Sequence, residues 1–216
     1  MNEVVTQKLH EFFEPYHLQS IGAGQRILSP GDSTENVIYL VSGSVKQYDI
    51  SDKGIEVVVN VFKENAFFPL YLKLLNVSNQ YFFDSLTDVK YKLAPATKVL
   101  DFLKTDNDVT LDLLARVYSG AIGQQRRMVH LMGGTARSRL IFELVTAVKR
   151  FGEFSSDGSV TLAMHEEDIA KLSGLSRETV SRELKKLKDE NLVSIINRKL
   201  SIANVTLLED LLGDKV

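Results

Sequence analysis

The apolar residues follow helical spacing near the start of the chain and strand-like spacing over the next eighty or so residues. A short amphipathic helix is predicted within the first 18 residues, with one apolar face made of Val5, Leu9, Phe12 and Phe13. From residue 19 to about 97 the apolar runs are short, rich in β-branched and aromatic residues, and separated by turn residues such as Pro30-Gly31. This spacing predicts short strands that form a sandwich or barrel.

A long helix is predicted for residues 106–132. Its stripe repeats in steps of three and four residues, which is the spacing of a coiled-coil seam, at Leu111, Leu114, Tyr118, Ala121, Gln125, Met128 and Met132. The stripe could instead pack on strands of its own chain. Gly120 and Gly123 each cost about 1 kcal/mol inside a helix. They either allow another helix to approach closely or leave this helix under-stabilised. Gly133 and Gly134 end the helix and form a hinge.

After the hinge, Thr135 is a suitable N-cap for a helix that turns apolar residues inward at Leu140, Ile141, Leu144, Val145 and Val148. Two shorter helices are predicted for residues 165–188. Their apolar sets are Ile169, Leu172 and Leu175 in the first helix, and Val180, Leu184 and Leu187 in the second. Gly174 separates the two runs, and Ser176 can cap the second. This is the helix-turn-helix pattern.

The outward face of the second short helix carries hydrogen-bond donors and acceptors that suit the base edges of a DNA major groove. Its residues are Arg177, Glu178, Ser181, Arg182 and Lys185. A helix that is merely solvated also has a polar outer face, and an acidic residue in a first turn complements the helix dipole. A hairpin follows, with Arg198 and Lys199 at its tip. We expect these two residues to contact phosphates, and a solvated turn is the alternative.

The amino-acid sequences of several segments resemble those of one family of regulators. SRETVSR at 176–182 and LKKLKDENLVSI at 184–195 closely resemble the recognition helix and following hairpin of the cyclic-AMP receptor protein and fumarate–nitrate regulator (Crp/Fnr) family. The segments GQRILSPGDSTENVIYLVSGSVKQYDISDKGIEVVVNVFKENAFF and YFFDSLTDVKYKLAP resemble the β-roll of the same family. The resemblance runs from about residue 20 to residue 205.

This resemblance implies an α+β fold in three parts. Residues 1–105 would form a β-roll sensor domain, a jelly roll of the cyclic-nucleotide-binding type. Residues 106–134 would form the dimerisation helix and hinge, which makes the apolar stripe a dimer interface. Residues 135–216 would form a winged helix-turn-helix DNA-binding domain. His165 matches a position where the family places a helix-capping residue.

The resemblance also implies a function and its partners. The protein would be a homodimeric transcription regulator that binds double-stranded DNA at an inverted-repeat promoter site and contacts RNA polymerase. In the family, the residues matching Arg177, Glu178 and Arg182 contact bases, and Ser181 matches a base-contacting serine of the fumarate–nitrate branch. A ligand-binding or protein-interaction module, with the helix-turn-helix as a docking surface, is the alternative from another class.

The possible effector pocket departs from the pattern of cyclic-nucleotide binders. Their glycine–glutamate pair and their arginine–serine–alanine run are replaced here by Pro69, Leu70, Asn79, Gln80 and Tyr81. No arginine occurs between Arg26 and Arg116, so a bound phosphate would lack its bidentate partner. Gln124 and Gln125 lie near the family's base-contacting positions. They could bind another ligand, or pair across the dimer seam.

The strands around these positions offer aromatic side chains instead, at Phe67, Phe68, Tyr71, Tyr81, Phe82 and Phe83. Aromatic residues in strands more often fill a core than bind a ligand. We therefore expect a roll that is filled by its own side chains, or one that takes a small apolar or neutral effector. Response to cyclic AMP through an altered pocket is the alternative.

Composition removes several kinds of site. The chain has no cysteine, which excludes disulfides, thiolate zinc sites and cysteine-ligated iron–sulfur clusters. The fumarate–nitrate branch senses oxygen through such a cluster, so this chain cannot. The four histidines have no ligand spacing, and no nucleophile motif occurs. We expect no enzyme activity, metal or cofactor. The sequence has no membrane span or secretory signal, so a cytoplasmic location is expected.

The net charge of −2 is unusual for a DNA-binding protein until the charges are located. Residues 171–199 contain eight basic and four acidic side chains. Phosphate binding requires a basic face and not a basic protein. The local excess is small, so affinity for DNA should be modest without base contacts.

Overall fold

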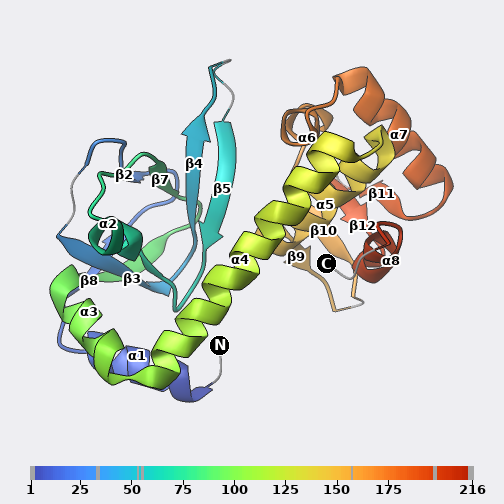
Figure 1. Cartoon of the computed structure of the whole chain (residues 1–216). Coiled ribbons are helices and arrows are strands. Elements are labelled where there is room, and N and C mark those ends of the chain that lie inside the picture. Colours follow the sequence, from blue (N-terminus) through green and yellow to red (C-terminus); the bar gives the residue numbers. More distant parts are fainter. Residues whose placement is uncertain are drawn as a thin grey trace. The chain divides into compact units, whose positions relative to one another are not determined.

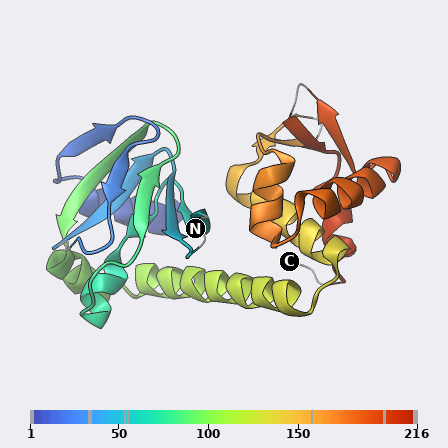
Figure 2. The same cartoon turned by 90° about the horizontal axis from the view of Figure 1, so that it is seen from above.

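The computed structural model describes residues 3–32, 35–52, 54, 56–156, 158–196 and 199–213. The chain forms two compact units, Met1–Val117 and Tyr118–Val216 (Figure 1). The division falls inside α4 (Asn107–Gly133), a single unbroken helix (Figure 2) that matches the predicted long helix. Each unit is therefore described by itself.

The first unit is the β-roll that the sequence predicts. Its two four-stranded antiparallel sheets have the orders β1-β8-β3-β6 and β2-β7-β4-β5. The strands are β1 (Leu18–Ile21), β2 (Arg26–Leu28), β3 (Asn36–Ser42), β4 (Val45–Ile50), β5 (Glu56–Phe62), β6 (Phe67–Phe68), β7 (Phe82–Ser85) and β8 (Val89–Pro95). The Pro30-Gly31 turn is confirmed, because Gly31 has a φ of 88° and Asp32 N–H donates to the Ser29 carbonyl at 3.1 Å.

Three helices accompany the strands: α1 (Glu3–Phe13), α2 (Leu70–Leu75) and α3 (Ala96–Thr105). The predicted apolar face of α1 is confirmed, with Val5, Leu9 and Phe13 buried against the roll. Helix α3 was not predicted from the pattern. It follows β8 without a connecting loop, so its short run of apolar positions merges with those of the strand.

The inside of the roll is filled by stacked aromatic rings. Phe68 lies 4.2 Å from the ring centre of Phe62 and 5.4 Å from that of Phe83, and all three pack in one cluster. Phe82 lies on the opposite face of its strand and stacks on Tyr48 at 5.2 Å. The aromatic residues of the strands therefore fill space on both faces of this sheet.

Helix α4 has 27 residues, and Val109 is its one buried residue. Every position of the predicted stripe is exposed within the chain, including Leu111 at 63%, Tyr118 at 63% and Met132 at 78%. A helix normally obtains most of its stability from an apolar face that is packed. This face has no such packing in its own chain.

The second unit is a winged helix-turn-helix. Its helices are α5 (Ala136–Phe151), α6 (Glu166–Ser173), α7 (Arg177–Asp189) and α8 (Val205–Asp210). Its sheet has the order β11-β12-β10-β9, with β9 (Glu153–Phe154), β10 (Val160–Leu162), β11 (Val193–Ile196) and β12 (Lys199–Ile202). The Thr135 side chain accepts from Ser138 N–H at 3.1 Å, so the predicted cap of α5 is confirmed.

One apolar cluster holds this unit together. It contains the five inward residues predicted for α5, and it also takes residues from all three helices that follow and from the sheet. Among its fully buried members are Val180, Leu184 and Leu187 of α7, which fixes the opposite face of that helix outward.

Candidate nucleic-acid interface

The turn between α6 and α7 is built by the two residues that the sequence indicates. Gly174 ends α6 in the left-handed conformation, with a φ of 63°, which favours glycine. Ser176 is the N-cap of α7, and its hydroxyl oxygen accepts from Thr179 N–H at 3.3 Å. Because Ile169 and Val180 are both buried in the common core, the two helices hold a fixed relation to each other.

The beginning of α6 is capped by a carboxylate. His165 stands at the N-cap position, as expected, and its backbone N–H donates to the Asp168 carboxylate at 3.0 Å. The expected cap position of His165 is confirmed, and Asp168 supplies the reciprocal bond of a capping box.

The five residues predicted on the outer face of α7 lie together. All are exposed, and they line one open depression of about 780 Å³. Two further residues line it that sequence reasoning did not single out, Lys188 and Glu166. Lys188 continues the same helix face one turn beyond Lys185 and could have been found by its spacing. Glu166 comes from α6, so only the fold brings it here.

The charges on this face are arranged for recognition of hydrogen-bonding partners. The Glu178 carboxylate accepts from its own backbone N–H and from the Ser176 hydroxyl, and these bonds hold the pKa of Glu178 below its usual range. Glu178 is therefore an ionised acceptor at neutral pH. The Arg182 side chain is 66% exposed, with the Glu183 carboxylate 3.7 Å from its Nε. That carboxylate lies closer to Lys186, at 2.8 Å, which leaves the Arg182 guanidinium turned to solvent.

The hairpin of β11 and β12 is the wing, and its basic residue Lys199 does not line this depression. Lys199 begins β12, and its Nζ lies 2.7 Å from the Glu153 carboxylate of β9. The hydrogen bond from Lys199 lowers the pKa of Glu153. Lys199 thus has a partner already, which a DNA phosphate would have to displace. Arg198 lies outside the described residues.

Two ion pairs link the helices of this unit. Arg137, in the first turn of α5, makes a bidentate pair with Glu190, which follows α7, with bonds of 2.9 and 2.5 Å. Arg127 of α4 donates from Nε to the Glu143 carboxylate of α5 at 2.7 Å, and this pair is nearly buried, with side chains 11% and 2% exposed. Arg127 also donates to the Leu172 carbonyl of α6 at 3.5 Å. One guanidinium therefore contacts both α5 and α6.

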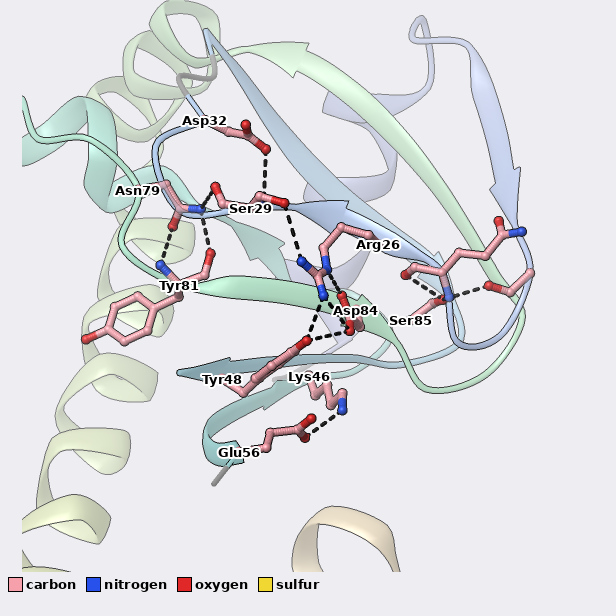
Figure 3. A network of polar contacts seen from close by, with 12 residues as sticks. Arg26, Ser29, Asp32, Lys46, Tyr48, Glu56, Asn79, Tyr81, Asp84 and Ser85 are labelled. Atoms are coloured by element: carbon pink, nitrogen blue, oxygen red, sulfur yellow. Dashed lines mark hydrogen bonds and ion pairs between the residues drawn. The ribbon is translucent and has the colours of Figure 1, made fainter. Parts of the chain in front are cut away.

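Two of the positions singled out for an effector, Asn79 and Leu70, serve the fold of the roll. Asn79 is 2% exposed. Its amide donates to the carbonyls of Ser29 and Tyr81 at 2.7 and 2.6 Å, and its oxygen accepts from Tyr81 N–H (Figure 3). The same oxygen accepts from the Tyr71 hydroxyl at 3.3 Å. Leu70 is buried in the core, and Gln80 is exposed. Asn79 therefore has its hydrogen bonds satisfied within the chain.

Arg26, the last arginine before the arginine-free segment that ends at Arg116, is also engaged. Its guanidinium pairs with the Asp84 carboxylate and donates to the Tyr48 hydroxyl at 2.8 Å (Figure 3). It also lies 4.4 Å above the ring of Phe82. Burial and the hydrogen bond to Asp84 raise the pKa of Tyr48 to about 12, so its hydroxyl stays protonated and donates to Asp84 at 2.8 Å. Phe82 and Asp84 flank the inward Phe83 on β7, and their face of the strand turns away from the interior.

Within the described residues no helix is long and apolar enough to cross a membrane. In the same part of the chain, no group of three or more histidine, cysteine, aspartate or glutamate side chains is placed to hold a metal ion.

Comparison with known proteins finds a matching domain model and several similar proteins. The model of the Crp-like helix-turn-helix domain matches residues 138–211, from α5 to α8. The global nitrogen regulator of a Synechocystis species is 27% identical over 203 residues, covering 93% of this chain and 90% of that protein. The global nitrogen regulator of a Nostoc species is 28% identical over 192 residues, covering 87% and 86%. Residues 138–211 therefore match a Crp-like helix-turn-helix domain, and most of the chain is similar to regulators of this type.

The fold of this chain agrees with that of solved structures. A CRP/FNR-family transcriptional regulator from Thermus thermophilus has a TM-score of 0.71 and 21% identity, covering 93% of this chain and all of the other. The predicted α+β fold, with a β-roll, a long helix and a winged helix-turn-helix, is confirmed.

The buried pair of Arg127 and Glu143 gives a testable prediction. Burial already raises the pKa of Glu143, and Arg127 opposes that shift. Arg127→Met would leave a buried carboxylate without this partner, so the free energy of unfolding should fall by about 3–5 kcal/mol. When the pKa of a carboxyl is higher in the folded than in the unfolded state, the protein loses stability as pH rises. The melting temperature of the variant should therefore fall more steeply than that of the wild type from about pH 5 to pH 8.

The control is the double variant Arg127→Met with Glu143→Leu, which removes both charges and keeps apolar volume. It should recover most of the lost stability and show no added pH dependence. A single variant as stable as the wild type at pH 8 would contradict the role assigned to this pair.

Proposed function

We propose that this chain is a homodimeric transcription regulator that binds duplex DNA with α7 in the major groove. The observation that carries the proposal is the exposed face of α7. Donor and acceptor side chains line one open depression there, and the opposite face is fixed in the core. The second helix of a helix-turn-helix reads base edges in this way. The match to the Crp-like domain supports the same function. The proposed regulator would bind DNA in the cytoplasm, and this function would require no enzyme activity.

The residues of this face have distinct proposed roles. Arg177 and Arg182 donate to guanine, and the ionised Glu178 accepts from the amino group of cytosine. Ser181 and Lys185 complete the contact with base edges and neighbouring phosphates. The target is an inverted repeat with a TGA core in each half-site. On the wing, Lys199 exchanges Glu153 for a phosphate, and Arg198 belongs to the same proposed contact.

The exposed stripe of α4 is the proposed dimer interface. A second copy would cover apolar side chains that the chain itself leaves exposed, and their steps of three and four residues fit a two-helix seam. A Cβ at Gly120 or Gly123 would meet no atom of the chain within 4 Å, so packing within the chain does not require these glycines. Close approach of a second helix would require glycine at these two positions. Gln125 lies in this seam, and Gln124 beside it.

The proposed working parts are the roll of residues 1–105 as sensor domain, residues 106–134 as dimerisation helix and hinge, and residues 135–216 as DNA-binding domain. Contact with RNA polymerase belongs to the proposal, as expected of a regulator that acts at promoters.

We also propose that cyclic nucleotides do not control this regulator. The stacked rings of Phe62, Phe68 and Phe83 fill the roll, and the polar groups of Arg26 and Asn79 are used within the fold. A phosphate carried into such an interior would lose its hydration without gaining a cation. The roll either acts without an effector or takes a small apolar or neutral one.

Arg182→Ala should weaken binding to the cognate duplex by about 1–3 kcal/mol and relax base preference, because a bidentate contact with guanine is lost. Lys199→Ala should weaken binding to all sequences alike. Duplexes enriched by the wild-type protein from a randomised library provide the cognate site, and fluorescence anisotropy over a salt series measures affinity. Unchanged affinity and base preference in Arg182→Ala would contradict the assignment of α7. Absence of salt-dependent binding by the wild type would favour a docking module instead.

Leu114→Glu and Met128→Glu should each convert the dimer into a monomer, because a charge would be buried in an apolar seam. Sedimentation velocity measures the change. Leu75→Glu is the matched control, since Leu75 is 67% exposed on α2 and lies outside the stripe. This control should remain dimeric. A wild-type protein that is monomeric at micromolar concentration would contradict the proposed interface.

Cyclic AMP and cyclic GMP at millimolar concentration should leave the melting temperature and the affinity for DNA unchanged. A ligand present at about 100 times its dissociation constant would add about 2.7 kcal/mol to the free energy of unfolding, which a thermal shift detects. A clear rise in melting temperature with either nucleotide, lost in Gln80→Ala or Tyr81→Ala, would show that the altered pocket still binds it.

A further inference from the structure

Helix α6 begins with three consecutive carboxylates, Glu166, Glu167 and Asp168. Two of them have partners within the helix. Asp168 accepts from the backbone N–H of His165 at 3.0 Å, and Glu167 lies 3.1 Å from the Nζ of Lys171. All three complement the helix dipole from the first turn. The dipole alone therefore does not distinguish them.

Glu166 differs from its neighbours in where it lies. It lines the depression formed by the outer face of α7, and it is the one lining residue that does not come from that helix. It shares this depression with Arg177, Arg182 and Lys185, which are cations assigned to DNA, and with Lys188. Glu167 and Asp168 do not line this depression; they line a neighbouring hollow, to which Glu166 and Arg177 also contribute.

The position of Glu166 sets its relation to a bound duplex. When the second helix of a helix-turn-helix enters the major groove, the first helix crosses the phosphate backbone. A helix N-terminus there, with unpaired N–H groups and a positive dipole end, would favour a phosphate. A carboxylate offers no donor and repels an anion. The first turn of α6 therefore carries the wrong charge for the contact that its position would allow.

We propose that Glu166 is an affinity-limiting residue that repels the phosphodiester backbone of DNA. The inference rests on the proposed function. Because phosphates are the same in every sequence, this repulsion weakens binding to all duplexes equally. Binding that lasts then requires the base contacts of α7 and both halves of the dimer. Because the excess of positive charge on this face is small, a single carboxylate is enough to lower the affinity for DNA.

The test compares three variants on two DNA probes. The probes are a random-sequence duplex of about 30 bp, long enough for two half-sites one helical turn apart, and a duplex enriched by the wild-type protein from a randomised library. Glu166→Gln should raise affinity for both probes by about two- to fivefold for each DNA-binding domain that is bound, and by less at high salt. Glu166→Lys should raise it further and steepen the dependence of log K on log salt by about one.

Glu167→Gln is the matched control, because it removes a charge from the same helical turn and an equal interaction with the dipole. It should leave affinity for both probes unchanged. Melting temperatures of all variants verify that they fold. Equal effects of Glu166→Gln and Glu167→Gln would overturn the proposal. Weaker binding of Glu166→Gln to the enriched duplex alone would also overturn it, because Glu166 would then read a base.

A wild-type protein that binds neither probe would refute the proposed function together with this inference. Salt-dependent binding by the wild type that is unaffected by Glu166→Gln would refute only the role of Glu166. The two failures are therefore distinguishable.

Discussion

Helix α4 has an apolar face that its own chain does not cover, and this constraint governs the rest of the molecule. One residue of the 27 is buried, so side-chain packing within the chain contributes little to the stability of the helix. Two glycines in its middle weaken it further, by about 1 kcal/mol each. A helix of this kind becomes stable when a second helix packs along it. Formation of the proposed seam would then also determine where each DNA-binding unit begins.

The last turns of α4 are joined to the DNA-binding unit by polar as well as apolar contacts. The ring of His130 stacks on Phe142 at 4.6 Å, and Arg127 reaches both Glu143 and the Leu172 carbonyl. A buried ion pair adds little net stability compared with apolar residues of equal size, but it accepts only one geometry. This pair therefore fixes the end of α4 relative to the helix-turn-helix more strictly than an apolar contact would.

In the β-roll, groups that could have bound a ligand have structural partners. Buried polar atoms must be hydrogen-bonded, and Asn79 meets this requirement through the backbone on both sides of it. Arg26 is exposed, and it is paired with Asp84 and Tyr48 on the outer face of its sheet. With aromatic rings filling the interior, both the apolar core and these polar groups of the roll are used within the fold.

The sequence alone determined the elements whose signals are local. Periodic apolar positions and capping residues such as Thr135 and Ser176 predicted α1, α4, α5, α6 and α7, because each signal spans a few residues. The outer face of α7 could be predicted for the same reason. Only the tertiary structure paired Lys199 with Glu153, 46 residues away, and brought Glu166 to the face of α7. Such contacts depend on how strands and helices pack, and no spacing along the chain encodes the approach of two charges from different elements.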